Sequence, residues 1–475
     1  MCAVALLDES SSNPLVAGFA RRLRLHPDLP LIASPQRAWT TRQVAGAAER
    51  WGEAFAIAGL EPGDVVAWSA RGATFLAGWL GALSRGLAPI LIDAATPIEE
   101  VRRVADALRA RAIASSSAGL AELEPLGQLE MLPTRPLGPV NRLVDVAAIK
   151  LTSGSTGTPR GIAVSAEALL ADDAQLTLAM DLATATRFLA AIPLSHSYGL
   201  ASLAVPALTR FTAPVTLVVP DDVGPFHPLA AAERLGAEFL PTVPAWLGAM
   251  ARVNEAPPWP RSVRRVISAG APLTPEVALA FRRRFGLAAH VFYGSSETGG
   301  ISYDTVGDAA ERGTVGTPIP GVEIEIDPET ARVAVRSPAV AERYWPEPDP
   351  RLGGGRFLTS DLGRLDGGEL RLLGRADDWI LVRGKNVNPR EVEDILRAFP
   401  GVDEAAVFGS QGVGNPEPIV RAVVASRGEP RVEDLLAWCR ARLAEYKVPR
   451  GIAVVRQLPR TERGKLDRSA LPSWR

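Results

Sequence analysis

The chain has 475 residues, of which 47% are hydrophobic and 22% charged, and its formal net charge is −1. This length exceeds what one hydrophobic core usually serves, so the sequence predicts two or more domains. The near-zero charge gives no reason to expect a nucleic acid or an anionic membrane as partner. Two cysteines, Cys2 and Cys439, do not form a disulfide framework. The apolar opening 1–7 lacks the basic residues of a signal peptide, and no stretch has the length of a membrane span, so we expect a cytoplasmic protein.

Up to about Leu373, apolar runs typical of strands alternate with amphipathic runs typical of helices, which predicts a layered α/β domain. A helix is expected from Thr41 to a stop at Gly59, because Val44, Ala48, Trp51 and Phe55 share one face. Next come a buried strand at 65–68, a helix carrying Phe75, Trp79 and Leu83, and a strand at 88–92. Residues 121–142 are rich in Pro and Gly and are expected to be connecting structure.

Glycines at 353–355 mark a composition change, and after Arg375 the chain is typical of a compact α+β unit. The expected domains are therefore residues 1–374 and a smaller unit at 375–475. Asn388 is a good N-cap, Pro389 suits the first helical position, and the apolar stripe after them predicts a helix. Strands are expected at 405–408, 420–424 and 452–455, and a helix places Cys439 on an apolar face.

The most informative segment is Leu151-Thr152-Ser153-Gly154-Ser155-Thr156-Gly157-Thr158-Pro159-Arg160-Gly161, which follows a strand-like run at 147–151. Glycines allow the backbone to approach an anion, hydroxyl groups donate to phosphate oxygens, and a cation offsets the phosphate charge. The spacing differs from a Walker A loop. A polar surface linker is the alternative interpretation of this segment on its own.

Four further segments point to nucleotide chemistry. Tyr293-Gly294-Ser295-Ser296-Glu297-Thr298 follows an apolar strand-like run, and offers an aromatic ring, hydroxyl groups and a carboxylate suited to Mg²⁺. A carboxylate on a loop, where it could accept hydrogen bonds from both ribose hydroxyls, is expected in Thr359-Ser360-Asp361-Leu362-Gly363. Gly374-Arg375-Ala376-Asp377-Asp378 begins the C-terminal unit, and Arg463-Gly464-Lys465 presents a lysine near the end of the chain.

In this order, the five segments resemble the adenylate-forming, AMP-binding superfamily of acyl- and aryl-CoA synthetases, peptide-synthetase adenylation domains and luciferases. The resemblance spans residues from about 41 to 471. It implies a large N-terminal domain that binds ATP and an acid, followed by a smaller mobile domain. It also implies an ATP- and Mg²⁺-dependent acid–thiol ligase that makes an acyl-adenylate and transfers the acyl group to CoA or to the phosphopantetheine of a carrier protein.

The resemblance assigns nucleotide contacts to residues of this chain. The segment from Thr152 to Arg160 would wrap the β- and γ-phosphates, with arginine where lysine is usual. This exchange is not neutral, because a planar fork replaces a point charge. Tyr293, beside Gly294, would stack on adenine, Ser296 (usually threonine) would touch the adenylate phosphate, and Glu297 would hold Mg²⁺. Ribose contacts would come from Asp361 and Arg375, and Gly270 with Ala271 would lie beside adenine and the acyl group.

The C-terminal residues are assigned in the same way. Asp377 matches the hinge about which the small domain turns between half-reactions, and Lys465 matches the lysine that bridges the substrate carboxylate and the α-phosphate. The adenylation step needs no protein nucleophile, because the substrate carboxylate attacks phosphorus itself. Gly384 would line the tunnel for the thiol arm, and a plain turn glycine is the alternative.

The acid pocket is expected around Pro193-Leu194-Ser195-His196-Ser197-Tyr198-Gly199-Leu200. Amino-acid-activating relatives carry an aspartate here, and this chain does not, so the substrate is expected to lack an α-amino group. The resemblance makes His196 a gate or floor of the pocket, with a packed structural histidine as the alternative. Tyr198 and Thr242 are further expected wall residues, and a fatty or an aryl acid fits equally.

Three other functions remain open from sequence: an acyl-AMP ligase that loads a carrier protein, a luciferase-like oxygenase, and a catalytically inactive nucleotide-binding protein. Nothing in the residues points to oxygen chemistry. The presence of Glu297 and Lys465 argues against an inactive protein.

Overall fold

The computed structural model describes residues 7–124, 126–133, 142–152, 159–221, 226–253, 257–382, 385–411, 418–428, 430–460, 466–468 and 470–471. The chain divides into two compact units. The first comprises Met1–Glu325, Ala334–Leu358 and Gly367–Leu370, and the second comprises Ile326–Val333, Thr359–Asp366 and Arg371–Arg475. Within the described ranges, no helix has the length and apolarity that a membrane span requires.

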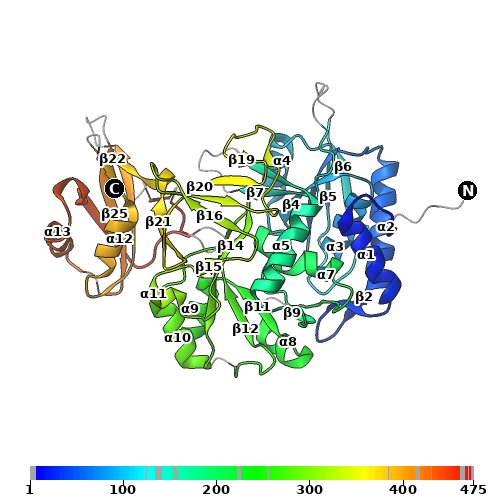
Figure 1. The fold of residues 1–475 in the computed structure, drawn as a ribbon, viewed down its shortest axis with the longest axis horizontal. Coiled ribbons are helices and arrows are strands. Elements are labelled where there is room, and N and C mark those ends of the chain that lie inside the picture. The colour runs from blue at the N-terminus through cyan, green and yellow to red at the C-terminus, as the bar shows by residue number, and fades with distance from the viewer. Residues whose placement is uncertain are drawn as a thin grey trace, which may run out of the picture. The chain divides into compact units, whose positions relative to one another are not determined.

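The first unit is built on two sheets with helices against them (Figure 1). Seven described strands form one sheet, in the order β18 (Arg343–Trp345), β8 (Arg160–Val164), β7 (Ala148–Thr152), β4 (Ala88–Asp93), β3 (Val65–Ala70), β5 (Ala112–Ser115) and β6 (Gln128–Met131). Nine described strands form the other, in the order β15 (Thr317–Pro318), β14 (Gly299–Tyr303), β13 (Ala289–Ser295), β12 (Arg265–Ser268), β11 (Phe239–Thr242), β9 (Arg187–Leu189), β10 (Thr216–Val218), β1 (Pro30–Ala33) and β2 (Ala38–Thr40).

The described helices of this unit are α1 (Pro14–Leu25), α2 (Thr41–Ile57), α3 (Gly72–Ser84), α4 (Ile98–Ala107), α5 (Ala166–Ala179), α6 (Ser197–Gly199), the π-helical turn η1 (Leu200–Ala204), α7 (Val205–Thr209), α8 (His227–Leu235), α9 (Pro244–Arg252), α10 (Pro275–Phe285) and α11 (Ala309–Arg312). The predicted helix from Thr41 is α2, and Thr40 with Gln43 closes a capping box at its start. Gly59, with φ +74°, follows its end.

Alternate residues of strand β3 pack into two different hydrophobic cores, one on each face of the sheet. Ala67 joins the cluster that contains Val101 and Val104 of α4. Trp68 packs edge-on against Trp51 of α2, with ring centroids 4.8 Å apart. Because successive side chains of a strand point to opposite faces, one apolar run stabilises both layers. This explains why the run at 65–70 is buried throughout and why the helices α3 and α4 flank it.

A third sheet contains β16 (Glu323–Ile326), β17 (Arg332–Arg336), β20 (Arg356–Asp366) and β19 (Leu352–Gly353), with β21 (Glu369–Arg375) beside β20. The described helices and strands that lie entirely in the second unit are η2 (Ala376–Asp378), β22 (Ile380–Val382), β23 (Lys385–Val387), α12 (Pro389–Arg397), β24 (Val402–Gln411), β25 (Pro418–Ser426), α13 (Val432–Arg440), η3 (Glu445–Lys447) and β26 (Gly451–Val455). Asn388 caps α12 by accepting from the Arg390 N–H, as predicted, and Cys439 is buried in the core between α12, α13 and the β24–β25–β26 sheet.

Two local expectations are corrected. The Pro- and Gly-rich segment 121–142 is not only connecting structure, because Gln128–Met131 forms strand β6 antiparallel to β5. The segment 359–363 is not a loop, because it lies inside the long strand β20. Residues 128–131 form a strand because they pair with the neighbouring strand β5, and local composition does not reveal such pairing.

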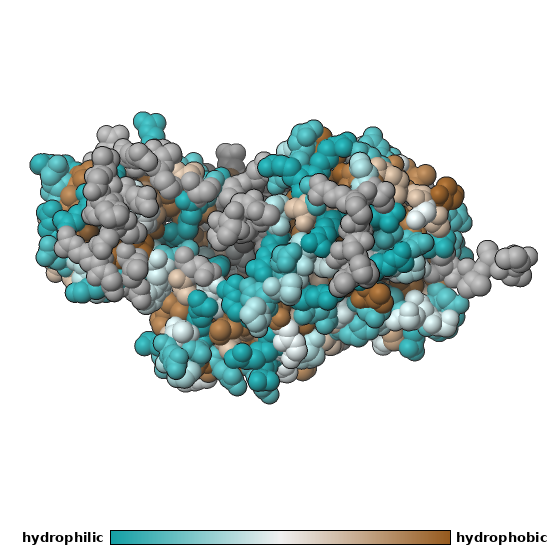
Figure 2. All heavy atoms as spheres, turned by 90° about the horizontal axis from the view of Figure 1, so that it is seen from above, coloured by the Kyte–Doolittle hydropathy of each residue, from teal (hydrophilic) through white to brown (hydrophobic). Residues whose placement is uncertain are grey.

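The surface face in Figure 2 is mainly hydrophilic, with hydrophobic residues scattered between polar ones. Among the residues that the structure describes, the most exposed large hydrophobic side chains belong to separate parts of the chain: Ile57, Val306 and Leu178. Single exposed apolar residues are ordinary for a globular protein and mark no interface by themselves.

Candidate active site

The candidate site is centred on the turn between β13 and β14. Strand β13 runs parallel to β12, and its last residues pair antiparallel with β14 after a register shift between Tyr293 and Gly294. A Cβ on Gly294 would lie 2.5 Å from the Gly299 carbonyl oxygen, so glycine is needed for this close approach. The turn therefore carries Ser296 and Glu297 just beyond the carboxyl end of a parallel strand, where α/β sheets typically bind ligands.

Glu297 is held by Ala341 and Tyr344, which lie far along the chain, and by Ser295 of its own turn. The Tyr344 hydroxyl, on β18 of the other sheet, donates to Glu297 Oε1 at 2.8 Å. The Ala341 N–H donates to the Glu297 carbonyl at 2.7 Å, and the Glu297 N–H donates to Ser295 Oγ at 3.2 Å. Burial, followed by the charge of Glu297, raises the pKa of Tyr344 far above its usual range. Tyr344 therefore stays protonated and holds the carboxylate as a hydrogen-bond donor.

The carboxylate fits a magnesium ion that arrives with a nucleotide. Among the described residues, no group of three or more His, Cys, Asp or Glu side chains is arranged to hold a metal. Mg²⁺ commonly binds one or two protein carboxylates and completes its shell with phosphate oxygens and water. Glu297 is partly exposed, and the Tyr344 hydroxyl bonds one of its two oxygens. A single supported carboxylate of this kind suits that mode of binding.

Arg160 lies against the same tyrosine. Its guanidinium carbon stands 3.8 Å from the centroid of the Tyr344 ring, and its NH groups bond Asp349 Oδ2 at 3.3 Å. Hydrogen bonds from Arg351, with the charges of both arginines adding to them, hold the pKa of the Asp349 carboxyl well below its usual range. Two arginines and one carboxylate leave one net positive charge, which can offset phosphate charge at this end of β8.

The ends of the predicted phosphate segment meet beside this cluster, because Thr152 of β7 pairs with Arg160 of β8. Ser153, Gly154, Ser155, Thr156 and Gly157 lie outside the described residues. The structure therefore brings the two ends of the segment together near Tyr344 and leaves its phosphate contacts a prediction.

The predicted acid segment touches the nucleotide segment directly. The hydroxyl of Ser197, the residue after His196, and that of Ser296 lie 2.8 Å apart. The Tyr198 ring is buried with its centroid 5.6 Å from that of Phe292, and its hydroxyl donates to the Ile267 carbonyl at 3.2 Å. His196 itself precedes the short helix α6 and is partly exposed.

The carboxyl ends of the neighbouring parallel strands β11 and β12 carry Thr242, Gly270 and Ala271. Thr242 is buried at the end of β11, and its carbonyl accepts from the Ala269 N–H at 3.1 Å. Gly270 has φ +82° and is exposed, as is Ala271. Only glycine adopts this backbone conformation readily, so the residue supports a sharp exit from β12. The burial of Thr242 points to packing as much as to a substrate contact.

Two buried charges beside the turn were not predicted from the sequence. Lys150 is 3% exposed in β7, and its Nζ donates to the Ser296 carbonyl at 3.4 Å. Asp172 is 2% exposed in α5, and accepts from the Gly300 N–H at 2.9 Å. The available signal was a lysine inside the apolar run 147–151, since a buried lysine is rare unless it has partners.

In the second unit, the two predicted ribose residues are close together. Arg375 Nε and Asp361 Oδ1 are 3.9 Å apart, between the adjacent strands β21 and β20. Arg375 precedes the turn η2, in which the backbone of Asp377 lies. Gly384 and Lys465 lie outside the described residues, so the thiol-tunnel and lysine assignments stay predictions.

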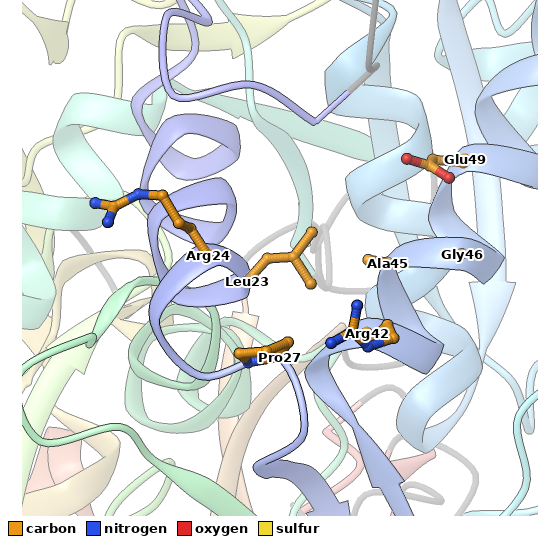
Figure 3. A pocket seen from close by; sticks show the side chains of 7 residues that line it. All are labelled: Leu23, Arg24, Pro27, Arg42, Ala45, Gly46 and Glu49. Atoms are coloured by element: carbon orange, nitrogen blue, oxygen red, sulfur yellow. The ribbon is translucent and has the colours of Figure 1, made fainter.

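A hollow of about 470 Å³ lies between α1 and α2 (Figure 3). Its wall residues are Leu23, Arg24, Pro27, Arg42, Ala45, Gly46 and Glu49. The arginines already form ion pairs, Arg24 with Glu9 and Arg42 with Asp28. None of the predicted site residues that the structure describes belongs to this wall, and the hollow carries no assignable chemistry.

Comparison with known proteins places this geometry in a family. The AMP-binding enzyme profile matches residues 19–345, and the AMP-binding enzyme C-terminal domain profile matches residues 391–465. The chain is 29% identical to a feruloyl-CoA synthase from Amycolatopsis sp, over 94% of this chain and 96% of that protein. It is 30% identical to the 2-succinylbenzoate–CoA ligase of Geobacillus kaustophilus, over 95% and 96% respectively.

A solved structure shares the fold. The O-succinylbenzoate coenzyme A synthetase of Bacillus subtilis, in complex with ATP and magnesium ion, matches with a TM-score of 0.78 and 22% identity. The match covers 96% of this chain and 98% of that chain. The expected architecture, a large α/β AMP-binding domain followed by a small C-terminal domain, is thereby confirmed.

Proposed function

The chain belongs to the AMP-binding enzyme family, and on that premise we propose that it joins a carboxylic acid without an α-amino group to the thiol of CoA through an acyl-adenylate. The observation that carries the proposal is the junction between Ser197 of the acid segment and Ser296 of the nucleotide segment, 2.8 Å apart beside the supported Glu297 carboxylate. An acid bound at the first segment would present its carboxylate to a nucleotide bound at the second.

An aryl acid is the substrate class we favour. The buried ring pair Tyr198 and Phe292 provides an apolar, aromatic surface next to Ser197. Two relatives carry names that denote CoA thioesters of aromatic acids, feruloyl and 2-succinylbenzoyl. The segment 192–200 has no carboxylate to pair with an α-ammonium group. Aromatic rings bind other rings well because offset and edge-on contacts add to the burial of apolar area.

In the proposed mechanism, the chain positions the reactants and offsets the charge of the phosphates. The covalent steps take place between the reactants themselves. The substrate carboxylate attacks the α-phosphorus, pyrophosphate leaves, and the thiol then displaces AMP from the acyl carbonyl. The net positive charge of Arg160, Asp349 and Arg351 would stabilise the leaving pyrophosphate. A Mg²⁺ ion held by Glu297 would add a Lewis acid on the phosphates. Tyr293, partly exposed beside Gly294, would cover adenine.

The C-terminal residues complete the proposal. We assign Lys465 to adenylation, Gly384 to passage of the thiol arm, Asp361 and Arg375 to the ribose, and Asp377 to a hinge at the start of a mobile unit spanning 375–475. The ion pair between Asp361 and Arg375 supports a shared role for those two residues. ATP and CoA as substrates suit the cytoplasmic location expected from the sequence.

The proposal is tested by ATP–pyrophosphate exchange with panels of aryl, fatty and amino acids. Aryl acids are expected to drive exchange best, and amino acids least. Exchange driven by a proteinogenic amino acid, with none from aryl or fatty acids, would refute the substrate class. Thioester formation with free CoA, compared with a panel of carrier proteins, then identifies the acceptor; product on a carrier protein alone would favour the acyl-AMP ligase.

A further inference from the structure

Lys150 links the predicted phosphate segment to the segment that bears Glu297. It stands in β7, directly before Leu151, where the predicted phosphate segment starts, and it is 3% exposed. Its Nζ donates at 3.4 Å to the carbonyl of Ser296, the residue before Glu297. The backbone of Glu297 is therefore attached to a strand of the other sheet through one buried cation.

Asp172 holds the other end of the same turn. Its Oδ1 accepts from the Gly300 N–H at 2.9 Å, and its side chain is 2% exposed in α5. Gly299 has φ +69°, and a Cβ there would lie 2.5 Å from the Asp172 carboxyl carbon. The carboxyl group thus packs directly on the backbone. Together Lys150 and Asp172 hold residues 296–300 from both ends.

The two charges compensate each other inside the protein. Burial lowers the pKa of Lys150, while the charges of Asp172 and Glu297 act to raise it. Burial raises the pKa of Asp172 to about 6, while the charge of Lys150 acts to lower it. An apolar side chain would fill the same space without this desolvation cost, so packing alone gives no reason for a lysine at this position.

We infer that Lys150 is a positioning residue that sets the place of the Glu297 carboxylate through the Ser296 carbonyl, with Asp172 as its charge partner and second support. The inference rests on the proposed function, because Glu297 is there the magnesium-binding carboxylate. Through Lys150, the strand that leads into the phosphate segment is bonded to the turn that bears Glu297. The groups proposed to bind the nucleotide phosphates and the metal are therefore positioned relative to one another.

Three variants separate positioning from stability. Lys150→Met keeps the length and apolar stem of the side chain and removes the bond to Ser296. Asp172→Asn keeps an oxygen for the Gly300 N–H and removes the charge, and the double variant removes both charges. Gln175→Met is a matched control, because Gln175 is buried in the same helix and its Oε1 accepts from Ser337 Oγ at 3.2 Å rather than from a group of residues 296–300.

The readouts are the unfolding midpoint in urea, the half-saturating Mg²⁺ concentration in pyrophosphate exchange, and the calorimetric affinity for ATP with and without Mg²⁺. Lys150→Met and the double variant are expected to raise half-saturating Mg²⁺ about tenfold and to weaken ATP binding only when Mg²⁺ is present. Gln175→Met is expected to stay within about twofold of the wild type. Asp172→Asn keeps an acceptor for the Gly300 N–H, so it is expected to raise half-saturating Mg²⁺ less than Lys150→Met does. The stability changes of the two single charge variants should sum to more than that of the double variant, as for a coupled pair.

A double variant whose Mg²⁺ response recovers together with its stability would overturn the inference, since Lys150 would then be only half of a structural ion pair. An unchanged Mg²⁺ response in folded Lys150→Met would overturn it as well. Wild-type protein that binds ATP in a Mg²⁺-dependent manner but shows no acid-dependent exchange would refute the proposed function and leave the positioning role to be judged by binding. Wild-type protein without Mg²⁺-dependent ATP binding would refute both.

Discussion

Removing one hydroxyl group should reveal how much the support of Glu297 contributes to adenylation. In Tyr344→Phe, the aromatic ring that stacks on Arg160 is kept, and the 2.8 Å hydrogen bond to Glu297 Oε1 is lost. Ring packing against Phe357, with centroids 6.4 Å apart, is kept as well. The substitution therefore tests the donor and leaves the surrounding contacts in place.

The expected loss follows from the type of bond. Hydrogen bonds to charged groups contribute about 1.5–3 kcal/mol, and Glu297 is partly exposed, so water can replace part of the lost bond. We take about 1.5 kcal/mol, which corresponds to roughly a tenfold decrease in kcat/KM for adenylation. Folding stability should fall by about 1 kcal/mol or less, because the carboxylate can rehydrate.

The assay is pyrophosphate exchange over a range of Mg²⁺ concentrations, together with urea unfolding. Tyr303→Phe is the matched control, since it removes another buried tyrosine hydroxyl from the same unit, on β14. Tyr344→Phe should lose activity mainly at limiting Mg²⁺, and the control should not. Equal activity of Tyr344→Phe and wild type at every Mg²⁺ concentration would show that Tyr344 does not orient the carboxylate.

Three further outcomes are expected. Glu297→Gln keeps the shape of the side chain and removes its charge, so adenylation should slow by roughly 10²–10³-fold in single-turnover assays; an unchanged rate at limiting Mg²⁺ would contradict the metal assignment. Because burial raises the pKa of Asp172 from 3.8 to about 6, the folded state favours its protonated form, and the stability that this form contributes is lost as the pH rises from about 4 to 6. Urea unfolding between pH 4 and 7 should therefore show the wild type losing up to about 3 kcal/mol relative to Asp172→Asn, and parallel pH profiles would argue against the shift. Lys465→Ala should abolish acyl-adenylate formation and still turn over supplied acyl-adenylate with thiol, whereas Gly384→Leu should do the reverse; equal loss of both steps in both variants would mean simple destabilisation of the C-terminal domain.

Local sequence was enough to predict the elements whose cause is local. The helix α2 was predicted from its start at Thr41 and an apolar face through Trp51, to which the structure adds the cap at Thr40. The helix α12 was predicted from the cap at Asn388 and the stripe after Pro389. Such helices form because capping and amphipathic spacing act within a few residues. The family, and with it the α/β architecture, followed from five ordered segments that each combine a residue type with a place along the chain.

What a local pattern could not give was pairing between distant segments. Strand β6 was missed because its only reason to be extended is the neighbouring strand β5, and Asp361 was expected on a loop because its neighbours resemble one. The strand β20 continues through Asp361 because β17 and β21 provide hydrogen-bond partners on its two sides. Strand formation depends on such partners more than on intrinsic preference.

The sequence by itself determined which residues we propose for the chemistry: the carboxylate of Glu297, the cation of Arg160 and the aromatic ring of Tyr293 all stand in recognisable segments. Only the tertiary structure decided what holds them. Tyr344 and Lys150 come from strands of the other sheet, 47 and 146 positions away from the groups that they bind. No periodicity spans such separations, because those contacts arise where two sheets meet and the two partners are unrelated in local pattern.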